Sequence, residues 1–204
     1  FVLSPIASKL EEVCESWLKQ LLKLPDDTAA GFVSDSSTAT ICGLLAGRNS
    51  LLGNLGYAVT KEGLFDAPQI KVVVGEEAHS TVFKALSIIG LGNARLIKVP
   101  TDGQGRIKAD EIPEPDNRTL LILQAGNVNT GAFDDFDSVC RKANAAGAWV
   151  HIDGAFGLWA AACEKTNHLT KGMELADSWS VDAHKTLNAP YDNGIVLCLS
   201  LIHI

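Results

Sequence analysis

Apolar positions repeat along this chain at two spacings, one typical of helices and one typical of buried strands. Near the N-terminus, apolar side chains recur at close to helical spacing over residues 3–24, and Pro25-Asp26-Asp27 ends that predicted helix. Further along, short apolar runs bounded by turn-forming residues predict buried strands. These strands are expected at residues 30–33, 70–74, 96–99, 118–124, 148–153 and 195–198, with another in the run that leads to Asp182.

Helical segments separate most of these strands. The helices are expected at about residues 39–52, 80–91 and 134–146, with shorter helical pieces at 107–112 and 158–162. The connections are too long for β-hairpins, which favours a mostly parallel sheet with helices on both faces. The predicted fold class is therefore α/β, with three layers in which helices cover a central sheet. Residues 1–29 are expected to form an N-terminal helix and a linker, and residues 30–204 one large domain.

Composition narrows the class of protein. The chain has 204 residues, of which 47% are hydrophobic and 20% are charged, as in a soluble globular domain. Its formal net charge of −7 argues against a nucleic-acid partner, which needs a basic face. No apolar run approaches the length of a membrane span and no signal peptide is recognisable, so we expect no membrane partner. The five scattered cysteines, without a CxxC pair, speak against a disulfide framework or a metal site and favour a location in the reducing cytoplasm.

A hydroxyl-rich loop follows the strand predicted at residues 30–33. Residues 34–38 read Ser-Asp-Ser-Ser-Thr and lead directly into a predicted helix. The free N–H groups and the dipole of a helix's first turn favour an anion such as phosphate, and hydroxyl groups add hydrogen-bond donors. Ser36 and Ser37 are therefore candidates for phosphate binding. The alternative is that one of them only caps the helix.

Other polar residues also stand where predicted strands end, namely His79, Thr130, Asp153 and the pair His184-Lys185. In an open parallel sheet, these strand ends converge on one crevice. Asp153 follows an apolar run, so we expect it to be partly buried and to have a cationic partner. Lys185 suits Schiff-base chemistry, because a desolvated amine can attack a carbonyl group. Taken singly, each residue also has a structural interpretation, such as a solvated lysine or an aspartate that caps the next helix.

Together these groups supply a phosphate site, a partner for a flat ring, a buried anion and an amine. Pyridoxal 5'-phosphate needs this set, because it binds a lysine as a Schiff base, pairs its pyridinium nitrogen with a carboxylate and is anchored by its phosphate. The sequence therefore predicts this cofactor.

At these residues the chain resembles the large domain of the pyridoxal-phosphate-dependent group II amino-acid decarboxylases, which have the aspartate-aminotransferase fold. The resemblance covers nearly the whole chain from about residue 30, and Lys185 follows Asp153 at a fitting interval (185 − 153 = 32). Five segments carry it in the expected order, namely Ser34–Thr40, Glu77–Ser80, Asn129–Asp134, Val150–Ala155 and Ser180–Lys185.

The resemblance implies a role for each candidate near the cofactor ring. Lys185 would form the Schiff base and later transfer a proton, and Asp153 would keep the ring nitrogen protonated. His79 would stack on the ring, Ala155 would touch its other face, and Thr130 would contact its substituents. The implied reaction is decarboxylation of an L-amino acid, in which the protonated ring stabilises the carbanion that remains.

The resemblance also implies how the phosphate is bound. Ser36 and Ser37 would bind it through backbone N–H groups and hydroxyls, with Asp182 and His184 lining the same side. The chain departs from the family here, because Asp35 stands in a loop that is usually rich in glycine. A carboxylate close to a phosphate is unfavourable unless it points away.

Several expectations concern the protein beyond the cofactor. The family builds its site across a dimer interface, so a homodimer that acts on a small amino-acid substrate is implied. The family's small C-terminal domain and the mobile loop with its catalytic tyrosine are not in the sequence, and the chain begins at Phe1, so we expect a fragment.

Other functions remain open at this point. An aminotransferase or a carbon–sulfur lyase on the same fold would share the cofactor residues, and a cofactor-binding fragment without activity is a further alternative. A nicotinamide-dependent dehydrogenase is disfavoured, because no GxGxxG follows the first strand.

Overall fold

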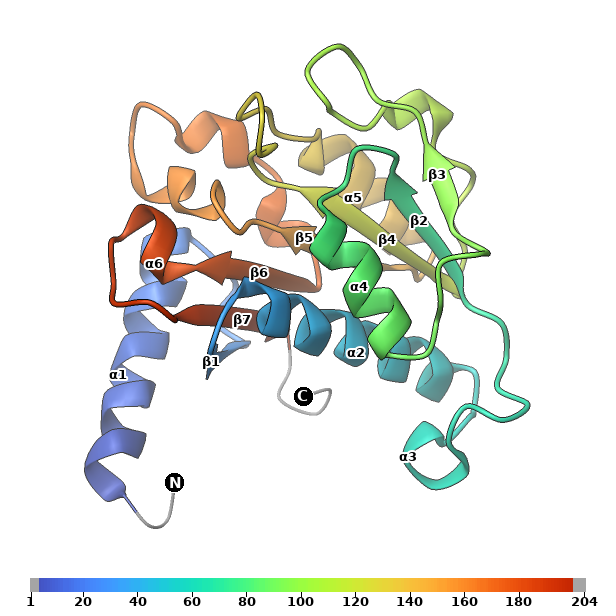
Figure 1. Cartoon of the computed structure of the whole chain (residues 1–204), viewed down its shortest axis with the longest axis horizontal. Helices are drawn as coiled ribbons and strands as arrows, with labels where there is room; N and C mark the ends of the chain where they lie inside the picture. The colour runs from blue at the N-terminus through green and yellow to red at the C-terminus, as the bar shows by residue number, and fades with distance from the viewer. Residues whose placement is uncertain (1–3, 200–204) are drawn as a thin grey trace.

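A seven-stranded sheet forms the centre of the molecule (Figure 1), and the computed structural model describes residues 4–199. The strands are β1 Thr28–Val33, β2 Lys71–Gly75, β3 Ile97–Val99, β4 Thr119–Gln124, β5 Trp149–Asp153, β6 Ser178–Asp182 and β7 Gly194–Leu199. Their order in the sheet is β1-β7-β6-β5-β4-β2-β3, and each neighbouring pair from β6 to β3 is parallel. The predicted α/β class and all the predicted strands are confirmed.

Strand β7 is the exception to the parallel order. It runs antiparallel to both of its neighbours, β6 and β1, so that Val33 of β1 lies opposite Gly194. Residues 183–193 connect β6 to β7 and include the short helix α6 (Ala183–Thr186). The sequence predicts this strand but not its direction, because a strand that is buried on both faces has the same apolar run either way.

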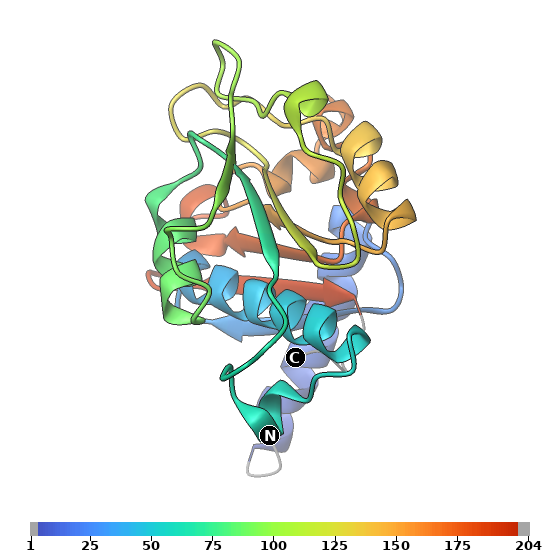
Figure 2. The same cartoon turned by 90° about the vertical axis from the view of Figure 1, so that its right-hand side faces the viewer.

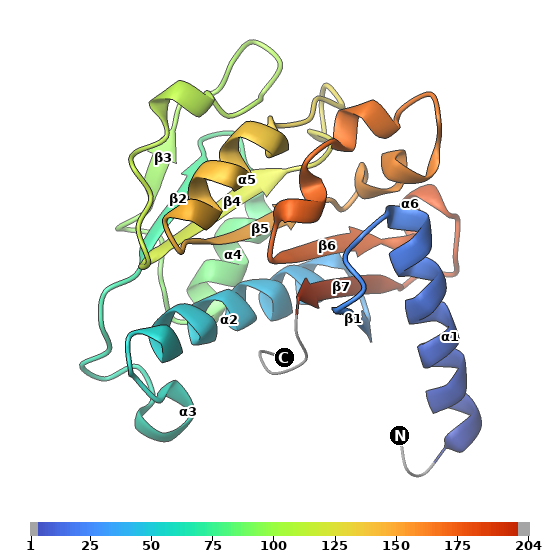
Figure 3. The same ribbon diagram turned by 180° about the vertical axis from the view of Figure 1, so that it is seen from behind.

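Helices cover both faces of the sheet. Figure 2 shows α2 (Ser36–Asn54) and α4 (Ser80–Ile88) on one face, and Figure 3 shows α5 (Phe136–Ala145) on the other. Successive strand residues point to opposite faces, so Val72 and Val74 pack with α2 and α4 while Val73 packs on the α5 side. The shorter helices are α3 Val59–Glu62 and the 3₁₀ helices η1 Ala109–Glu111, η2 Leu158–Ala162, η3 Asn167–Thr170 and η4 Met173–Leu175.

Two helices start at positions that differ from the prediction because of nearby aspartates. Helix α2 begins at Ser36 rather than at about residue 39, since the Asp35 side chain caps it by accepting a hydrogen bond from the Thr38 N–H. Helix α5 begins at Phe136 rather than at residue 134, and Asp135 caps it. Asp134 instead accepts hydrogen bonds from the backbone N–H groups of Ile107 and Gln124, and so links the segment at residue 107 to the end of β4.

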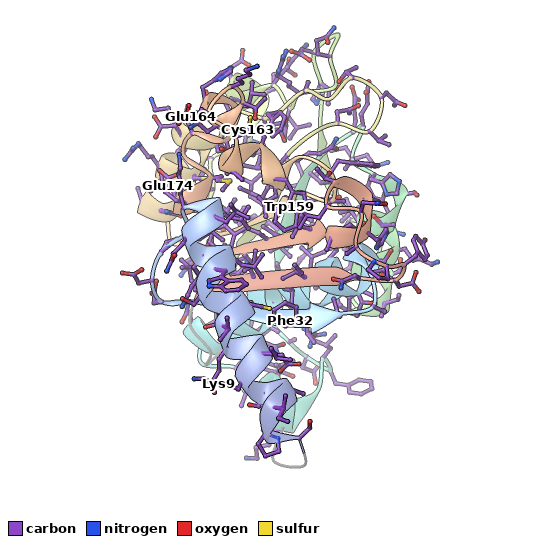
Figure 4. The ribbon with its side chains drawn as sticks, turned by 90° about the vertical axis from the view of Figure 1, so that its left-hand side faces the viewer. Lys9, Phe32, Trp159, Cys163, Glu164 and Glu174 are labelled. Atoms are coloured by element: carbon purple, nitrogen blue, oxygen red, sulfur yellow. The ribbon has the colours of Figure 1, made fainter. Side chains whose placement is uncertain are left out.

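The N-terminal helix α1 (Pro5–Leu22) is only partly packed against the domain (Figure 4). Leu18 and Leu22 join the core on the α5 side, whereas Ile6, Leu10 and Trp17 are 77%, 60% and 67% exposed. The predicted helix is confirmed over these residues, and much of its apolar stripe faces outward. No helix within residues 4–199 has the length and apolarity that a membrane crossing requires.

Candidate functional site

A cavity of about 180 Å³ opens where the carboxyl ends of β4, β5 and β6 meet the N-terminus of α2. This is the edge of a parallel sheet at which ligands are expected to bind. Eight of the nine predicted site residues line the cavity, namely Ser36, Ser37, His79, Asp153, Ala155, Asp182, His184 and Lys185. The structure therefore brings together residues that are up to 149 positions apart in the sequence (185 − 36 = 149).

Thr130 is the predicted residue that the structure does not bring to this cavity. Its hydroxyl donates a hydrogen bond of 2.6 Å to the carbonyl oxygen of Gln104, and its backbone N–H donates to the side chain of Asn127. Thr130 thus ties the loop after β4 to the turn near Gln104. The expected contact between Thr130 and the cofactor has no support in this geometry.

Lys185 lies in the short helix α6, directly after β6. Its Nζ is 2.7 Å from Oδ2 of Asp182 and 4.3 Å from the centre of the Phe156 ring. The amine is therefore held by an ion pair and by a cation–π contact. The sequence suggested a desolvated amine, and the structure places a carboxylate beside it, which the spacing of one helical turn allows.

Asp182 connects the lysine to the first turn of α2. Its side chain is buried, and the backbone N–H and the hydroxyl of Ser36 donate hydrogen bonds of 2.7 and 2.6 Å to its two oxygens. These are the donors of Ser36 that were expected to bind phosphate. In this structure they bind a carboxylate of the protein, which shows that the position accepts an anion.

The helix cap is Asp35, and the alternative that Ser36 or Ser37 caps α2 is wrong. Oδ1 of Asp35 accepts a hydrogen bond of 2.7 Å from the Thr38 N–H, and this hydrogen bond lowers the pKa of the Asp35 carboxyl. Asp35 also lines the cavity. The positive end of the α2 dipole is therefore already offset by two carboxylates, those of Asp35 and Asp182.

Asp153 ends strand β5 and is buried, with 6% of its surface exposed. Burial raises the pKa of its carboxyl, while nearby His79 and Lys185 lower it. The one hydrogen bond that its side chain accepts from the described residues comes from the Ala155 N–H, at 3.3 Å. The predicted burial is confirmed, but no ion pair with a described residue supplies the expected cation. Asp153 is also not a helix cap, since Gly157 precedes η2.

His79 and His184 border the cavity from opposite elements. His79 precedes α4, is exposed, and its Nδ1 lies 2.8 Å from the Thr81 hydroxyl, which fixes the tilt of the ring. His184 is nearly buried, its ring centre lies 4.3 Å from that of Tyr191 with the two rings tilted by 55°, and its Nδ1 lies 3.1 Å from the backbone of Asn193. Each imidazole thus has a neighbour within hydrogen-bond distance that orients it.

The cavity also has lining residues that sequence reasoning missed. They are Thr81, Gln124, Gly126, Val128, Phe156 and Tyr191. Phe156 and Tyr191 have the clearest roles, because they contact Lys185 and His184. A signal for Phe156 existed in its place just after Asp153, but Tyr191 lies in a turn-rich segment that indicates no contact.

The side chains that line the cavity fit pyridoxal 5'-phosphate. An amine, an imidazole and a buried carboxylate with few partners of its own line one cavity, and an anion site adjoins them at α2. The missing cation of Asp153 is what a protonated pyridine nitrogen would supply. Among residues 4–199, no group of three or more His, Cys, Asp or Glu side chains could hold a metal ion.

Comparison with known proteins gives relatives for nearly the whole chain. An aromatic-L-amino-acid decarboxylase of Bacillus atrophaeus is 30% identical over 199 residues, covering 94% of this chain and 39% of that protein. The protein of the same name from Bos taurus is 30% identical over 207 residues, covering 93% of this chain and 42% of its own length. The chain thus spans about two fifths of the length of these curated relatives.

Solved structures share the fold. The glutamate decarboxylase domain of diaminobutyrate-pyruvate transaminase and L-2,4-diaminobutyrate decarboxylase from Vibrio parahaemolyticus has a TM-score of 0.87 at 25% identity, covering 97% of this chain and 45% of that one. Residues 1–199 also match the family model described as "Pyridoxal-dependent decarboxylase conserved domain". With a family match over that length and a cavity equipped for the cofactor, the chain belongs to the pyridoxal-dependent decarboxylase family.

Proposed function

We propose that this chain carries the cofactor-binding part of an enzyme that decarboxylates an L-amino acid with pyridoxal 5'-phosphate. The observation that carries the proposal is that Lys185, Asp153 and His79 line one cavity at the carboxyl ends of the strands. The relatives at 30% identity include aromatic-L-amino-acid decarboxylases, which supports the reaction class. The substrate is proposed only as an L-amino acid, because the chain spans about two fifths of those relatives.

The bound cofactor supplies an aldehyde that condenses with amines and a protonated ring that takes up the electron pair left when CO₂ departs. Lys185 provides the amine for covalent attachment, and afterwards its Nζ can carry a proton to the substrate carbon. Asp182 orients that Nζ from 2.7 Å. Asp153 holds the proton on the ring nitrogen, since a buried carboxylate stabilises an adjacent cation.

The remaining residues hold the ring and the phosphate. His79 and Ala155 line the cavity and are proposed to contact the two faces of the ring. Ser36, Ser37 and His184 are proposed to bind the phosphate. Because Asp182 occupies the N–H and the hydroxyl of Ser36 in this structure, phosphate binding there requires Asp182 to share or release those donors.

Two copies of the protein are proposed to associate in the cytoplasm. The support is the outward stripe of α1, where Ile6, Leu10 and Trp17 are at least 60% exposed. Apolar patches of this kind mark surfaces that contact another molecule, and closed twofold dimers are the commonest assembly.

The test is covalent attachment of the cofactor. The protein is incubated with pyridoxal 5'-phosphate, reduced with borohydride, digested and analysed by mass spectrometry. We expect a stable adduct on Lys185 in the wild type and loss of that adduct in Lys185→Ala, because the amine is the attachment point. Lys171→Ala is the matched control, since Lys171 is exposed and pairs with Asp137 away from the cavity.

An adduct of unchanged amount in Lys185→Ala would show that another amine binds the cofactor and that the proposed role of Lys185 is wrong. Product analysis then separates the reaction classes. A decarboxylase releases CO₂ and an amine from L-amino acids, whereas an aminotransferase releases a keto acid.

A further inference from the structure

One face of α2 carries small and polar residues at spacings of four, three and four, namely Ser36, Thr40, Gly43 and Gly47. Residues at these spacings lie in line along a helix. Each meets a polar or aromatic side chain of β5 or β6, as Ser36 meets Asp182 and Thr40 meets Ser180. We call these four residues the stripe. They are buried and lie on the side of α2 that faces β5 and β6.

A buried chain of hydrogen bonds links this stripe to both strands. The Thr40 hydroxyl donates a 2.9 Å hydrogen bond to the Ser180 hydroxyl, which lies 3.3 Å from Nε2 of His151. Nδ1 of His151 lies 2.9 Å from the Ser178 hydroxyl, and the Trp149 indole N–H donates to that same hydroxyl at 3.0 Å. His151 is the centre of this chain, because each of its two ring nitrogens lies within hydrogen-bond distance of one serine hydroxyl.

The helix approaches the strands so closely along this stripe that side chains would collide. A Cβ atom at Gly43 would lie 2.6 Å from Cε1 of His151, and one at Gly47 would lie 2.7 Å from Cδ1 of Trp149. The helix therefore cannot slide along its axis without losing the Thr40 hydrogen bond or forcing its backbone onto the two rings.

Strand β6 relates this stripe to two carboxylates that line the cavity, those of Asp153 and Asp182. Ser180 lies opposite Asp153 in the pairing of β5 with β6, and Asp182 in the same strand binds Ser36 at the start of α2. The hydrogen bond between Thr40 and Ser180 thus relates the start of α2 to the strand position beside Asp153.

We infer that His151, Ser180 and Thr40 are positioning residues that fix the distance between the first turn of α2 and Asp153, so that one cofactor molecule can be held by its phosphate and by its ring at the same time. The inference rests on the proposed cofactor. It predicts that changes in the stripe weaken binding of a ligand that has both the ring and the phosphate, and leave binding of a ligand that has only the ring nearly unchanged.

The test compares pyridoxal 5'-phosphate with pyridoxal, which lacks the phosphate. Dissociation constants for both are measured by absorbance titration for the wild type, Thr40→Val and Thr40→Ser. Valine has the shape of threonine without the hydroxyl, and we expect Thr40→Val to weaken binding of the phosphate form by about tenfold while binding of pyridoxal changes by less than about twofold. Thr40→Ser keeps the hydroxyl and should restore binding.

Thr28→Val is the matched control. The Thr28 hydroxyl is buried in β1 and finds no hydrogen-bond partner among the described residues, so its removal should leave binding of both ligands unchanged. Ser180→Ala provides a second variant that breaks the chain from the strand side.

The outcomes distinguish failure of the positioning role from failure of the proposed function. If Thr40→Val weakens both ligands equally, or neither, the positioning role is overturned and the proposed cofactor stands. If the wild type binds neither ligand through Lys185, the proposed function fails and the positioning role fails with it.

Discussion

At the scale of single residues, buried carboxylates differ in what they do for stability. Asp177 lies directly before β6, and its side chain accepts a 2.7 Å hydrogen bond from the Val150 N–H. Burial raises the pKa of Asp177 from its ordinary value near 3.8 to about 6. The folded protein therefore holds this proton more tightly than the unfolded chain, so the contribution to stability is complete below pH 4 and is lost as the pH rises through 6.

We expect Asp177→Asn to raise the free energy of unfolding at pH 7.5 by about 2 kcal/mol, somewhat less than the full pKa shift implies because the group is partly solvated. The gain should shrink to near zero at pH 4, where the wild-type carboxyl is neutral. Urea unfolding at the two pH values measures it. Asp137→Asn is the control of opposite sign, since Arg141 lowers the pKa of Asp137. Equal gains at both pH values would contradict this account.

The sequence was informative about residues that stand at strand ends and less so about their partners. Asp153, His79 and Lys185 could be placed together because parallel strands end at one edge. The cap at Asp35 could not be distinguished from one at Ser36 or Ser37, because all three residue types cap helices. His151 gave no signal, since its hydrogen-bond partners lie in β6, 27 and 29 positions away.

At the scale of elements, α2 shows how closely a helix can be seated on a sheet. Gly43→Ala should lower the free energy of unfolding by about 2 kcal/mol, because the added methyl group meets the His151 ring and its neighbours must move. Gly53→Ala on the same helix is the matched control. Nothing lies within 4 Å of the added atom there, and alanine should stabilise the helix by about 0.5 kcal/mol.

Thermal and urea unfolding of both variants measure the difference. If Gly43→Ala were as stable as the wild type, the close approach of α2 to β5 would not be a constraint. The sequence predicted α2 from its apolar content, but the two glycines that permit this approach are ordinary helix residues until the facing rings are known.

At the scale of the whole molecule, the outward stripe of α1 sets an expectation for assembly. If two copies meet through this helix, Trp17→Glu combined with Leu10→Glu should convert a dimer into monomers, because a charge replaces apolar surface in the interface. Sedimentation velocity measures the change. Lys9→Ala is the control, since Lys9 is exposed and pairs only with Glu12 among the described residues. A wild-type protein that sediments as a monomer would refute the proposed dimer.

The antiparallel strand β7 has a consequence for synthesis on the ribosome. Strand β1 joins the sheet through β7, which begins 161 residues after β1 ends (194 − 33 = 161). At roughly 5–20 residues per second, the nascent chain carries β1 without its strand partner for about ten to thirty seconds. Its open edge is then accessible to neighbouring nascent chains on the same messenger. Lys185 emerges just before β7, so this amine and the strand partner of β1 arrive together at the end of that interval.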